Sequence, residues 1–378
     1  YFLEAARREN ILAPRSTFVN VLVNGNSIGV FFLEEHFRKE MLESMGRREG
    51  PIVRFDEGSF WDALLTARHV SGIAMPMPAT SGIRAWNVDG KEISAFEERR
   101  LSEDRVLSQT LYSAVEKMRA LQRAVFVSQS WGDKGRRLLE LEAFRGTTID
   151  RLMDTDRLAH SHALASLFQL THPIVWHNMR FYHNPLLDRL EPIMFDNMPH
   201  IEQHRRDPVV FQQAPIIKQF ATSASYYNGV FRYLGDICRP EYLELLFKDL
   251  DDEVQLFAAA LEAERPLGER YRVNAMKQRL RSQQVFLRSV IEPADPINFS
   301  SFYEVEDGEA GPISGILEIA AWSTTWTPVV LEGFRFGNGR TVAASSCVVD
   351  PPPDLAAEGK GGVVLPKGGQ RLLFRLSM

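Results

Sequence analysis

The sequence predicts an α+β fold for the larger part of the chain, followed by a second domain made mainly of strands. Short apolar runs flanked by Asn, Gly, Pro and Asp, at residues 17–33 and 179–195, have the composition of antiparallel hairpins. Residues 101–126 carry apolar side chains at the spacing of a long helix. From residues 293–296 onward the chain becomes rich in Gly, Pro, Ser and Val, which indicates a change of fold class at that point.

Length and composition allow this division. The 378 residues are enough for two domains of ~100–200 residues each, and we place them at residues 1–292 and 297–378. A net charge of −5 gives no electrostatic footprint for nucleic acid. The two cysteines, Cys238 and Cys347, are far apart and show no metal spacing. This segment contains no signal peptide and no apolar run long enough to cross a bilayer.

The N-terminal part predicts a helix, a hairpin and a further strand. Residues 1–11 read as a helix, because their apolar positions fall close to one face. Residues 17–23 and 28–33 read as strands joined at Asn24-Gly25-Asn26, where Gly and Asn accept a positive φ. The second of these strands is apolar enough to be buried on both faces. Residues 52–55 then form a short strand of their own.

Helices dominate the middle of the chain. A helix is expected at residues 59–70, followed by a loop broken by Pro and Gly. Residues 156–170 predict a strong helix in which His160 and His162 point to different sides, so that they do not share a metal ion. Residues 240–264 and 276–291 predict two helices packed antiparallel across a Pro-Leu-Gly break.

The last part of the chain predicts a β-sandwich-like domain. Short alternating runs occur at residues 313–322, 327–336, 341–349 and 371–378. Domains of this kind usually bind or orient, and the sequence assigns no ligand to this one.

The densest cluster of reactive side chains lies in residues 170–198. A hairpin of residues 179–184 and 189–195 would bring Asn178, just before its first strand, close to Asp196, just after its second. An amide oxygen beside a carboxylate suits Mg²⁺, which takes one or two protein ligands together with phosphate oxygens and water. The alternative interpretation is a plain turn with no metal.

Two segments resemble the CotH family of atypical, secreted protein kinases found in spore coats. HNMRFY at residues 177–182 and EPIMFD at residues 191–196 are similar to that family's metal-binding core. APRSTFVNVLVNGNSIGVFFLEEHFRKEML at residues 13–42 is similar to its segment of strand, Asn-Gly turn, strand and helix.

The resemblance implies a protein-kinase-like fold of two lobes in which the N-terminal lobe is incomplete. Residues 1–60 would be the remnant of that lobe, and residues 100–292 would be the helical C-terminal lobe. It further implies ATP and Mg²⁺ as cofactors, held through Asn178 and Asp196. The expected activity is phosphorylation of Ser or Thr hydroxyls in a protein substrate, and the expected location is outside the cell or on its surface. The Gly-rich loop and the ATP-binding Lys are expected upstream of Tyr1.

Two further positions match the family and have simpler alternatives. Glu35 stands where the family has a Glu at the end of the second strand, so that nucleotide contact is one interpretation and capping of the next helix is the other. Arg54 stands where many members have Lys; it would hold phosphate through its guanidinium, or form an ion pair with Asp56 or Glu57.

One departure from the kinase pattern concerns the catalytic base. Kinases carry an Asp five positions before the metal-binding Asn, and here that position is Pro173. His172 and His177 are the nearest groups able to accept a proton near neutral pH. Two alternatives to an active kinase therefore remain: a catalytically silent kinase-like scaffold that binds a surface or a partner, and a zinc hydrolase that uses the histidines.

Overall fold

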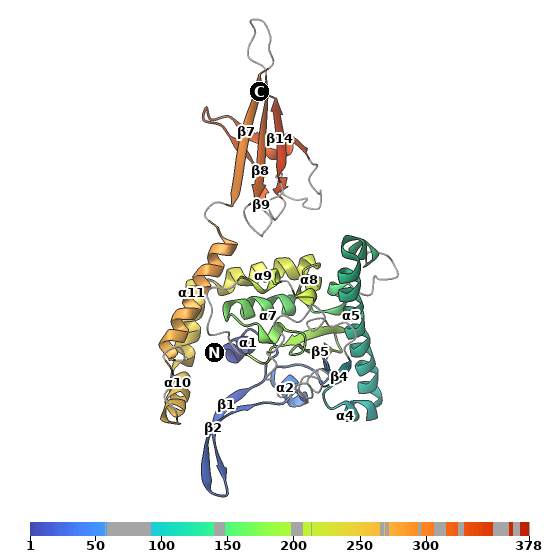
Figure 1. The fold of residues 1–378 in the computed structure, drawn as a ribbon, viewed down its shortest axis with the longest axis vertical. Coiled ribbons are helices and arrows are strands. Elements are labelled where there is room, and N and C mark those ends of the chain that lie inside the picture. The colour runs from blue at the N-terminus through green and yellow to red at the C-terminus, as the bar shows by residue number, and fades with distance from the viewer. Residues whose placement is uncertain are drawn as a thin grey trace, which may run out of the picture. The chain divides into compact units, whose positions relative to one another are not determined.

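The computed structural model describes residues 1–56, 58, 92–139, 148–197, 207–212, 214–264, 268, 272–293, 296–305, 315–323, 329–350, 363–365 and 371–377. The helix predicted at residues 59–70 and the loop after it lie outside these residues. Helices and antiparallel sheets are both present, so the chain is α+β as predicted. The chain divides into two compact units, Tyr1–Leu287 and Arg288–Met378 (Figure 1).

The first unit contains helices, short 3₁₀ turns and two antiparallel sheets. Its helical elements are α1 (Phe2–Arg8), α2 (Lys39–Ser44), α4 (Glu98–Glu103), α5 (Arg105–Leu139), α6 (Ile149–Leu152), α7 (Thr155–Leu167), η2 (His172–Ile174), η3 (Val209–Phe211), α8 (Pro215–Phe220), α9 (Ala224–Ile237), α10 (Pro240–Glu264) and most of α11 (Val273–Ile291). Its strands are β1 (Ser16–Val23), β2 (Asn26–Glu34), β3 (Ile52–Phe55), β4 (Ile93–Ala95), β5 (Arg180–Asn184) and β6 (Arg189–Ile193).

The central sheet of this unit has the strand order β4-β3-β5-β6, with every pair antiparallel. The hairpin predicted at residues 179–195 is therefore confirmed as β5 and β6. All five residues of β5 are buried. Two isolated parallel bridges, Leu12 to Ile193 and Met153 to Leu190, attach β6 to the segments that follow α1 and α6. Strand β6 is thus bonded to two further segments of the chain besides β5.

Helix α7 is the buried helix of the unit, and α9 packs along it (Figure 1). Gly229 of α9 makes this close approach possible, since a Cβ there would lie 2.8 Å from the Cβ of Ala159. The two histidines of α7 point to different sides, as predicted. The His160 ring stacks on Tyr233 with centroids 3.9 Å apart, whereas Nδ1 of His162 lies 2.7 Å from the Tyr226 hydroxyl.

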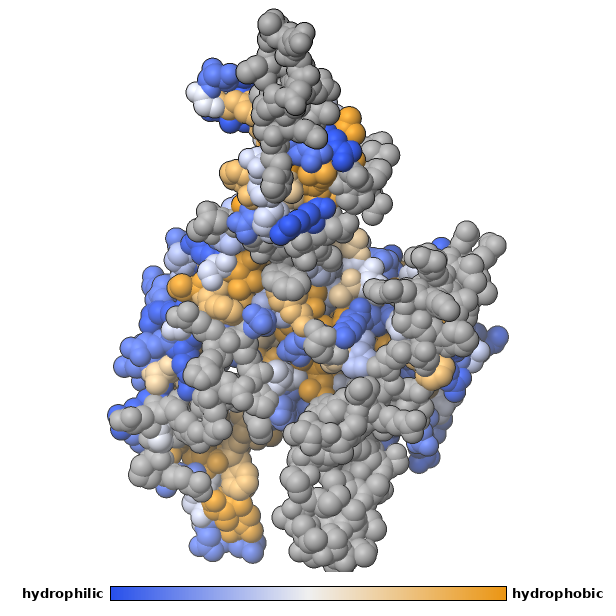
Figure 2. Space-filling model, turned by 45° about the horizontal axis from the view of Figure 1, so that its top comes forward, coloured by the Kyte–Doolittle hydropathy of each residue, from blue (hydrophilic) through white to orange (hydrophobic). Residues whose placement is uncertain are grey.

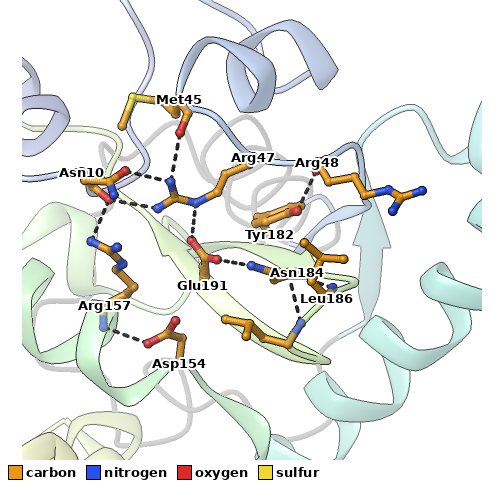
Figure 3. A network of polar contacts seen from close by, with 11 residues as sticks. Asn10, Met45, Arg47, Arg48, Asp154, Arg157, Tyr182, Asn184, Leu186 and Glu191 are labelled. Carbon is orange, nitrogen blue, oxygen red and sulfur yellow. Dashed lines mark hydrogen bonds and ion pairs between the residues drawn. The ribbon is translucent and has the colours of Figure 1, made fainter.

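A polar network fixes the β5–β6 hairpin to the N-terminal part of the unit (Figure 3). Arg47 donates from Nε to Glu191 at 2.9 Å and from Nη1 to the Asn10 side chain at 2.7 Å. Asn184 donates to the other Glu191 oxygen at 2.6 Å. Asn184 also accepts from the backbone N–H of Leu186 at 2.9 Å, which closes the hairpin turn. Because Glu191 is 3% exposed, this ion pair is an interior one.

The hairpin of β1 and β2 differs from the expectation in one respect. Its strands pair antiparallel around the Asn-Gly turn, as predicted, but the second strand is not buried on both faces. Phe31, Phe32 and Leu33 are 47%, 49% and 55% exposed. Figure 2 shows an apolar projection at the place that this hairpin occupies in Figure 1. The prediction of burial was wrong because an apolar run reports hydrophobicity and not what packs against it.

Helices α10 and α11 pack antiparallel, as predicted. Lys277 bonds to Asp251 at 2.7 Å and Arg281 bonds to Glu244 at 2.6 Å, so that positions later in α11 meet positions earlier in α10. Helix α1 contacts the same pair: Arg8 bonds to Asp249 at 2.8 Å, across 241 positions of sequence. No helix within the described ranges is both long and apolar enough to cross a lipid bilayer.

The second unit consists of small antiparallel sheets. Its elements are β7 (Ile297–Val305), β8 (Gly315–Ser323), β9 (Val329–Leu331), β10 (Gly333–Arg335), β11 (Thr341–Ala343), η5 (Ala344–Ser346), β12 (Val348–Asp350), β13 (Val363–Leu365) and β14 (Leu372–Ser377). The larger sheet has the order β12-β14-β8-β7, and β13-β9 and β10-β11 are two-stranded. Ile319 and Phe374, on one face of the larger sheet, share a core with Val363 and Leu365 of β13.

Candidate functional site

The structure brings Asn178 and Asp196 into direct contact. Asn178 precedes β5 and Asp196 follows β6, and the register pairs Arg180 with Ile193, which places the two ends of the hairpin side by side. Nδ2 of Asn178 donates to Oδ2 of Asp196 at 2.5 Å. The predicted proximity of the two side chains is therefore present, but the amide faces the carboxylate with its nitrogen and not with its oxygen.

Asp196 has two further properties of a functional residue. Its backbone lies in the left-handed region with φ of 51°, a conformation that costs free energy in residues other than Gly and collects at functional sites. Its side chain is 30% exposed, whereas the amide of Asn178 is buried. The carboxylate is thus anchored by a buried group while it stays open to solvent.

His172 belongs to the same cluster. Its Nδ1 lies 3.1 Å from Oδ2 of Asp196, the oxygen that also accepts from Asn178. His172 opens the 3₁₀ turn η2, and the next residue is the buried Pro173. The structure therefore gathers His172, Asn178 and Asp196, and it places no proton acceptor at the Pro173 side chain.

Glu34 is a member of the site that sequence reasoning missed. Burial raises the pKa of the Glu34 carboxyl, and the negative charge of Asp196 raises it further. The family resemblance matched the neighbouring residue, Glu35. Because successive strand residues point to opposite sides, only one of the two glutamates at the end of β2 could face the hairpin, and the sequence did not show which.

Glu35 is engaged elsewhere. Nε of Arg15 donates to Oε2 of Glu35 at 3.1 Å, and Nη2 of Arg15 forms an ion pair with Oε1. Burial raises the pKa of Glu35, but the hydrogen bonds from Arg15 outweigh it and leave the pKa below its ordinary value. Both oxygens are therefore occupied within the protein, and the structure does not bring Glu35 to the Asn178–Asp196 pair.

Arg54 lies on β3 and follows the simpler of its two interpretations. It donates from Nε to Oγ of Ser94 at 3.1 Å, and its Nη2 lies 3.6 Å from the Asp56 carboxylate. Its guanidinium also lies 5.1 Å from the centroid of the Phe96 ring. A backbone hydrogen bond from Gly58 and the bond from Ser94 lower the pKa of Asp56, and the charge of Arg54 lowers it further.

His177 and His183 contact other residues and not the Asn178–Asp196 pair. The His177 ring packs edge-on against Trp176 with centroids 5.4 Å apart, and its carbonyl accepts from Arg180 at 2.6 Å. Nε2 of His183 lies 2.9 Å from Asp188 in the hairpin turn. Within the part of the chain that the structure describes, no three His, Cys, Asp or Glu side chains come together as metal ligands would.

Aromatic packing holds the segment that carries Asp196. The ring of the preceding residue, Phe195, packs against Phe37 with centroids 5.0 Å apart. The buried guanidinium of Arg180 lies 5.3 Å from the centroid of the Phe195 ring. Because Phe195 is fixed on both sides, the position of Asp196 next to Asn178 depends on packing as well as on strand register.

The first unit also contains a cavity of about 880 Å³. Its walls include Leu170 and Asn197 but none of His172, Asn178 and Asp196.

A comparison with models of known protein families finds no match for this chain. A comparison with curated proteins finds none either.

Proposed function

We propose that the first unit is a kinase-like phosphotransferase of the CotH type that uses ATP and Mg²⁺. The observation that carries this proposal is the 2.5 Å contact between the Asn178 amide and the Asp196 carboxylate. In protein kinases an Asn and an Asp hold the Mg²⁺ that accompanies the nucleotide. The likeness of residues 13–42 and 177–196 to the CotH family supports the same function and a two-lobed kinase-like arrangement.

The donor set fits a hard cation. Asn178 and Asp196 offer an amide oxygen and carboxylate oxygens, which are the ligand types that Mg²⁺ takes, together with phosphate oxygens and water. Glu34 adds a second carboxylate beside Asp196, whose charge would be better tolerated next to a divalent cation. The bound ion would neutralise charge on the transferred phosphoryl group.

His172 takes the place of the missing base in this proposal. Its imidazole lies 3.1 Å from the Asp196 carboxylate, which orients the ring. A histidine held in this way is able to accept the proton of a substrate hydroxyl. His177 remains the second candidate, whereas Glu35 and Arg54 hold neighbouring segments in place through Arg15, Ser94 and Asp56.

The rest of the proposal follows from the family likeness. The substrate would be a Ser or Thr hydroxyl of a protein, and the protein would act outside the cell or on its surface. The second unit would be a β-sandwich-like accessory domain. The shared core of Ile319 and Phe374 with Val363 and Leu365 supports this interpretation, because one face of the larger sheet packs against a second sheet.

Pro173 favours a second candidate function, a catalytically silent kinase-like scaffold. The position that holds the catalytic Asp in kinases is occupied here by a buried residue without a proton acceptor. A scaffold could still bind nucleotide and Mg²⁺ without transferring phosphate. Incubation with radiolabelled ATP and a panel of protein substrates separates the two functions, since only the transferase labels protein.

The metal assignment is tested with Asp196→Asn, which removes the charge and keeps a residue that tolerates positive φ. We expect the affinity for ATP in the presence of Mg²⁺ to fall about tenfold or more, as measured by titration calorimetry. Asp188→Asn is the matched control. Asp188 also has positive φ, 49°, and lies in the turn of the same hairpin, so its replacement should leave nucleotide binding unchanged. Equal affinity of Asp196→Asn and the unmodified protein would show that this carboxylate holds no metal ion for ATP.

A further inference from the structure

The cavity of about 880 Å³ lies within the first unit and is separate from the Asn178–Asp196 pair. Helix α1, the start of β1, the segment after α7, and helices α10 and α11 surround it. Figure 1 shows α1 next to α10 and α11. Sites for small molecules usually have volumes of ~300–1,000 Å³ and mostly apolar walls with a few polar groups. By size, this cavity falls within that class.

Aromatic rings form part of its walls. Phe2 and Phe168 are buried and pack edge-on, with centroids 5.4 Å apart. Phe18 and Phe257 meet at 5.1 Å from the opposite side and are only half-buried, so part of each ring faces the open volume. Leaving aromatic surface in contact with water costs free energy. An apolar body placed against these rings would remove that cost.

The charged groups in the walls favour an anion. Arg7 and Arg279 are half-buried, and within the described part of the chain neither guanidinium is hydrogen-bonded to a carboxylate. Within these described residues, the only hydrogen bond of the Arg7 side chain is the one that it donates to the Ala13 carbonyl at 3.0 Å.

The carboxylates near the cavity are bonded to other arginines or exposed to solvent. Glu4 is bonded to Arg8 at 3.3 Å, and Glu253 is exposed to solvent. Arg7 lowers the pKa of Glu35 through its charge, but the oxygens of Glu35 are bonded to Arg15.

From the volume, the aromatic walls and the two arginines, we propose that the cavity binds an amphiphile with an apolar chain and an anionic head, of the fatty carboxylate class. The chain lies against Phe18 and Phe257, and the head group bonds to Arg7 or Arg279. The segments of Leu170 and Asn197 adjoin His172 and Asp196, so the ligand also contacts the chain that carries the phosphotransfer site. The binding itself does not depend on the proposed phosphotransferase activity.

The chemical class is tested with octanoate, decanoate, dodecanoate and tetradecanoate, each titrated calorimetrically below its micelle concentration. Each added CH₂ that enters an apolar site should raise the affinity about fourfold, with one molecule bound per chain and a plateau when the cavity is full. Alkyltrimethylammonium ions of the same lengths should bind more weakly. Equal or tighter binding of the cations would overturn the anionic head, and an affinity that does not change with chain length would overturn the apolar body.

The location is tested with Val254→Trp, which places a large ring inside the cavity from α10. We expect dodecanoate binding to fall at least about tenfold. Leu256→Trp is the matched control, because Leu256 is on the same helix, is 67% exposed and does not line the cavity. Leu280→Trp from α11 gives a second filled variant if the first does not fold. Unchanged binding in a folded filled variant, as judged by circular dichroism, would exclude this site.

Discussion

At the scale of single residues, Glu191 is a buried carboxylate of the first unit that is paired with Arg47. It is 3% exposed, and its carboxylate accepts from Arg47 at 2.9 Å and from Asn184 at 2.6 Å. A buried charge of this kind is tolerated only while its partners remain in place. Glu191 therefore secures the hairpin that carries Asn178 and Asp196, even though it takes no part in the proposed chemistry.

Glu191→Gln should lower the free energy of unfolding by ~3 kcal/mol, because it leaves the Arg47 guanidinium buried without its counter-charge. The control is Glu103→Gln. Glu103 pairs with Arg99 at 3.0 Å, but the two side chains are 65% and 93% exposed, so the loss should stay below ~0.5 kcal/mol. Urea unfolding followed by circular dichroism measures both changes. Similar losses for the two variants would contradict the structural importance of the buried pair.

His162 makes stability depend on pH. Burial lowers its pKa from the ordinary value of 6.5 to about 3, so the unfolded chain takes up a proton at this position near pH 6.5 and the native protein does not. The contribution of His162 to the free energy of unfolding is therefore fully present above pH 6.5. It falls as the pH decreases, by up to ~1.4 kcal/mol for each pH unit.

Urea unfolding at pH 7 and pH 5 should show a smaller loss for His162→Gln than for the unmodified protein, because glutamine does not titrate. His36→Gln removes an exposed histidine and should keep the original dependence. An unaltered pH dependence in His162→Gln would mean that another group causes it.

At the scale of elements, the close contact of α7 with α9 depends on Gly229, which has no Cβ. A Cβ at Gly229 would lie 2.8 Å from the Cβ of Ala159, whereas a Cβ at Gly235 on the same helix would meet nothing within 4 Å. Gly229→Ala should therefore destabilise the protein by ~1–3 kcal/mol through overpacking. Gly235→Ala should stabilise it by ~0.5–1 kcal/mol through helix propensity. Thermal unfolding separates the two, and a stabilised Gly229→Ala would refute the close approach.

Helices and strands were predictable where the sequence pattern that specifies them lies within the element and its adjoining turn. The β5–β6 hairpin followed from Asn, Pro and Asp between apolar runs, and it correctly predicted the contact of Asn178 with Asp196. The antiparallel α10 and α11 followed from a break between two periodic stretches. The exposure of β2 could not be predicted from its sequence. Whether an apolar strand is covered depends on segments that lie elsewhere in the chain.

At the scale of the whole molecule, the contacts that the sequence failed to predict join segments that lie far apart in the chain. The pairing of Arg47 with Glu191 spans 144 positions and follows no periodic pattern. The choice between Glu34 and Glu35 required the direction in which β2 enters the fold. The cavity is built from α1, β1, α10 and α11, and no single one of these segments has an unusual composition. Local chemistry thus predicted the contact of Asn178 with Asp196, and only the assembled unit showed which residues surround it.

The contact of α1 with α10 also determines when the first unit can be completed during synthesis. Arg8 is synthesised 241 positions before its partner Asp249. Bringing these two residues together closes a long loop, which costs conformational entropy. Phe2 of α1 packs on Phe168, directly after α7, whereas the contact of α1 with α10 forms only after α10 has been synthesised. Folding of the first unit should therefore be completed only after α10 has been synthesised.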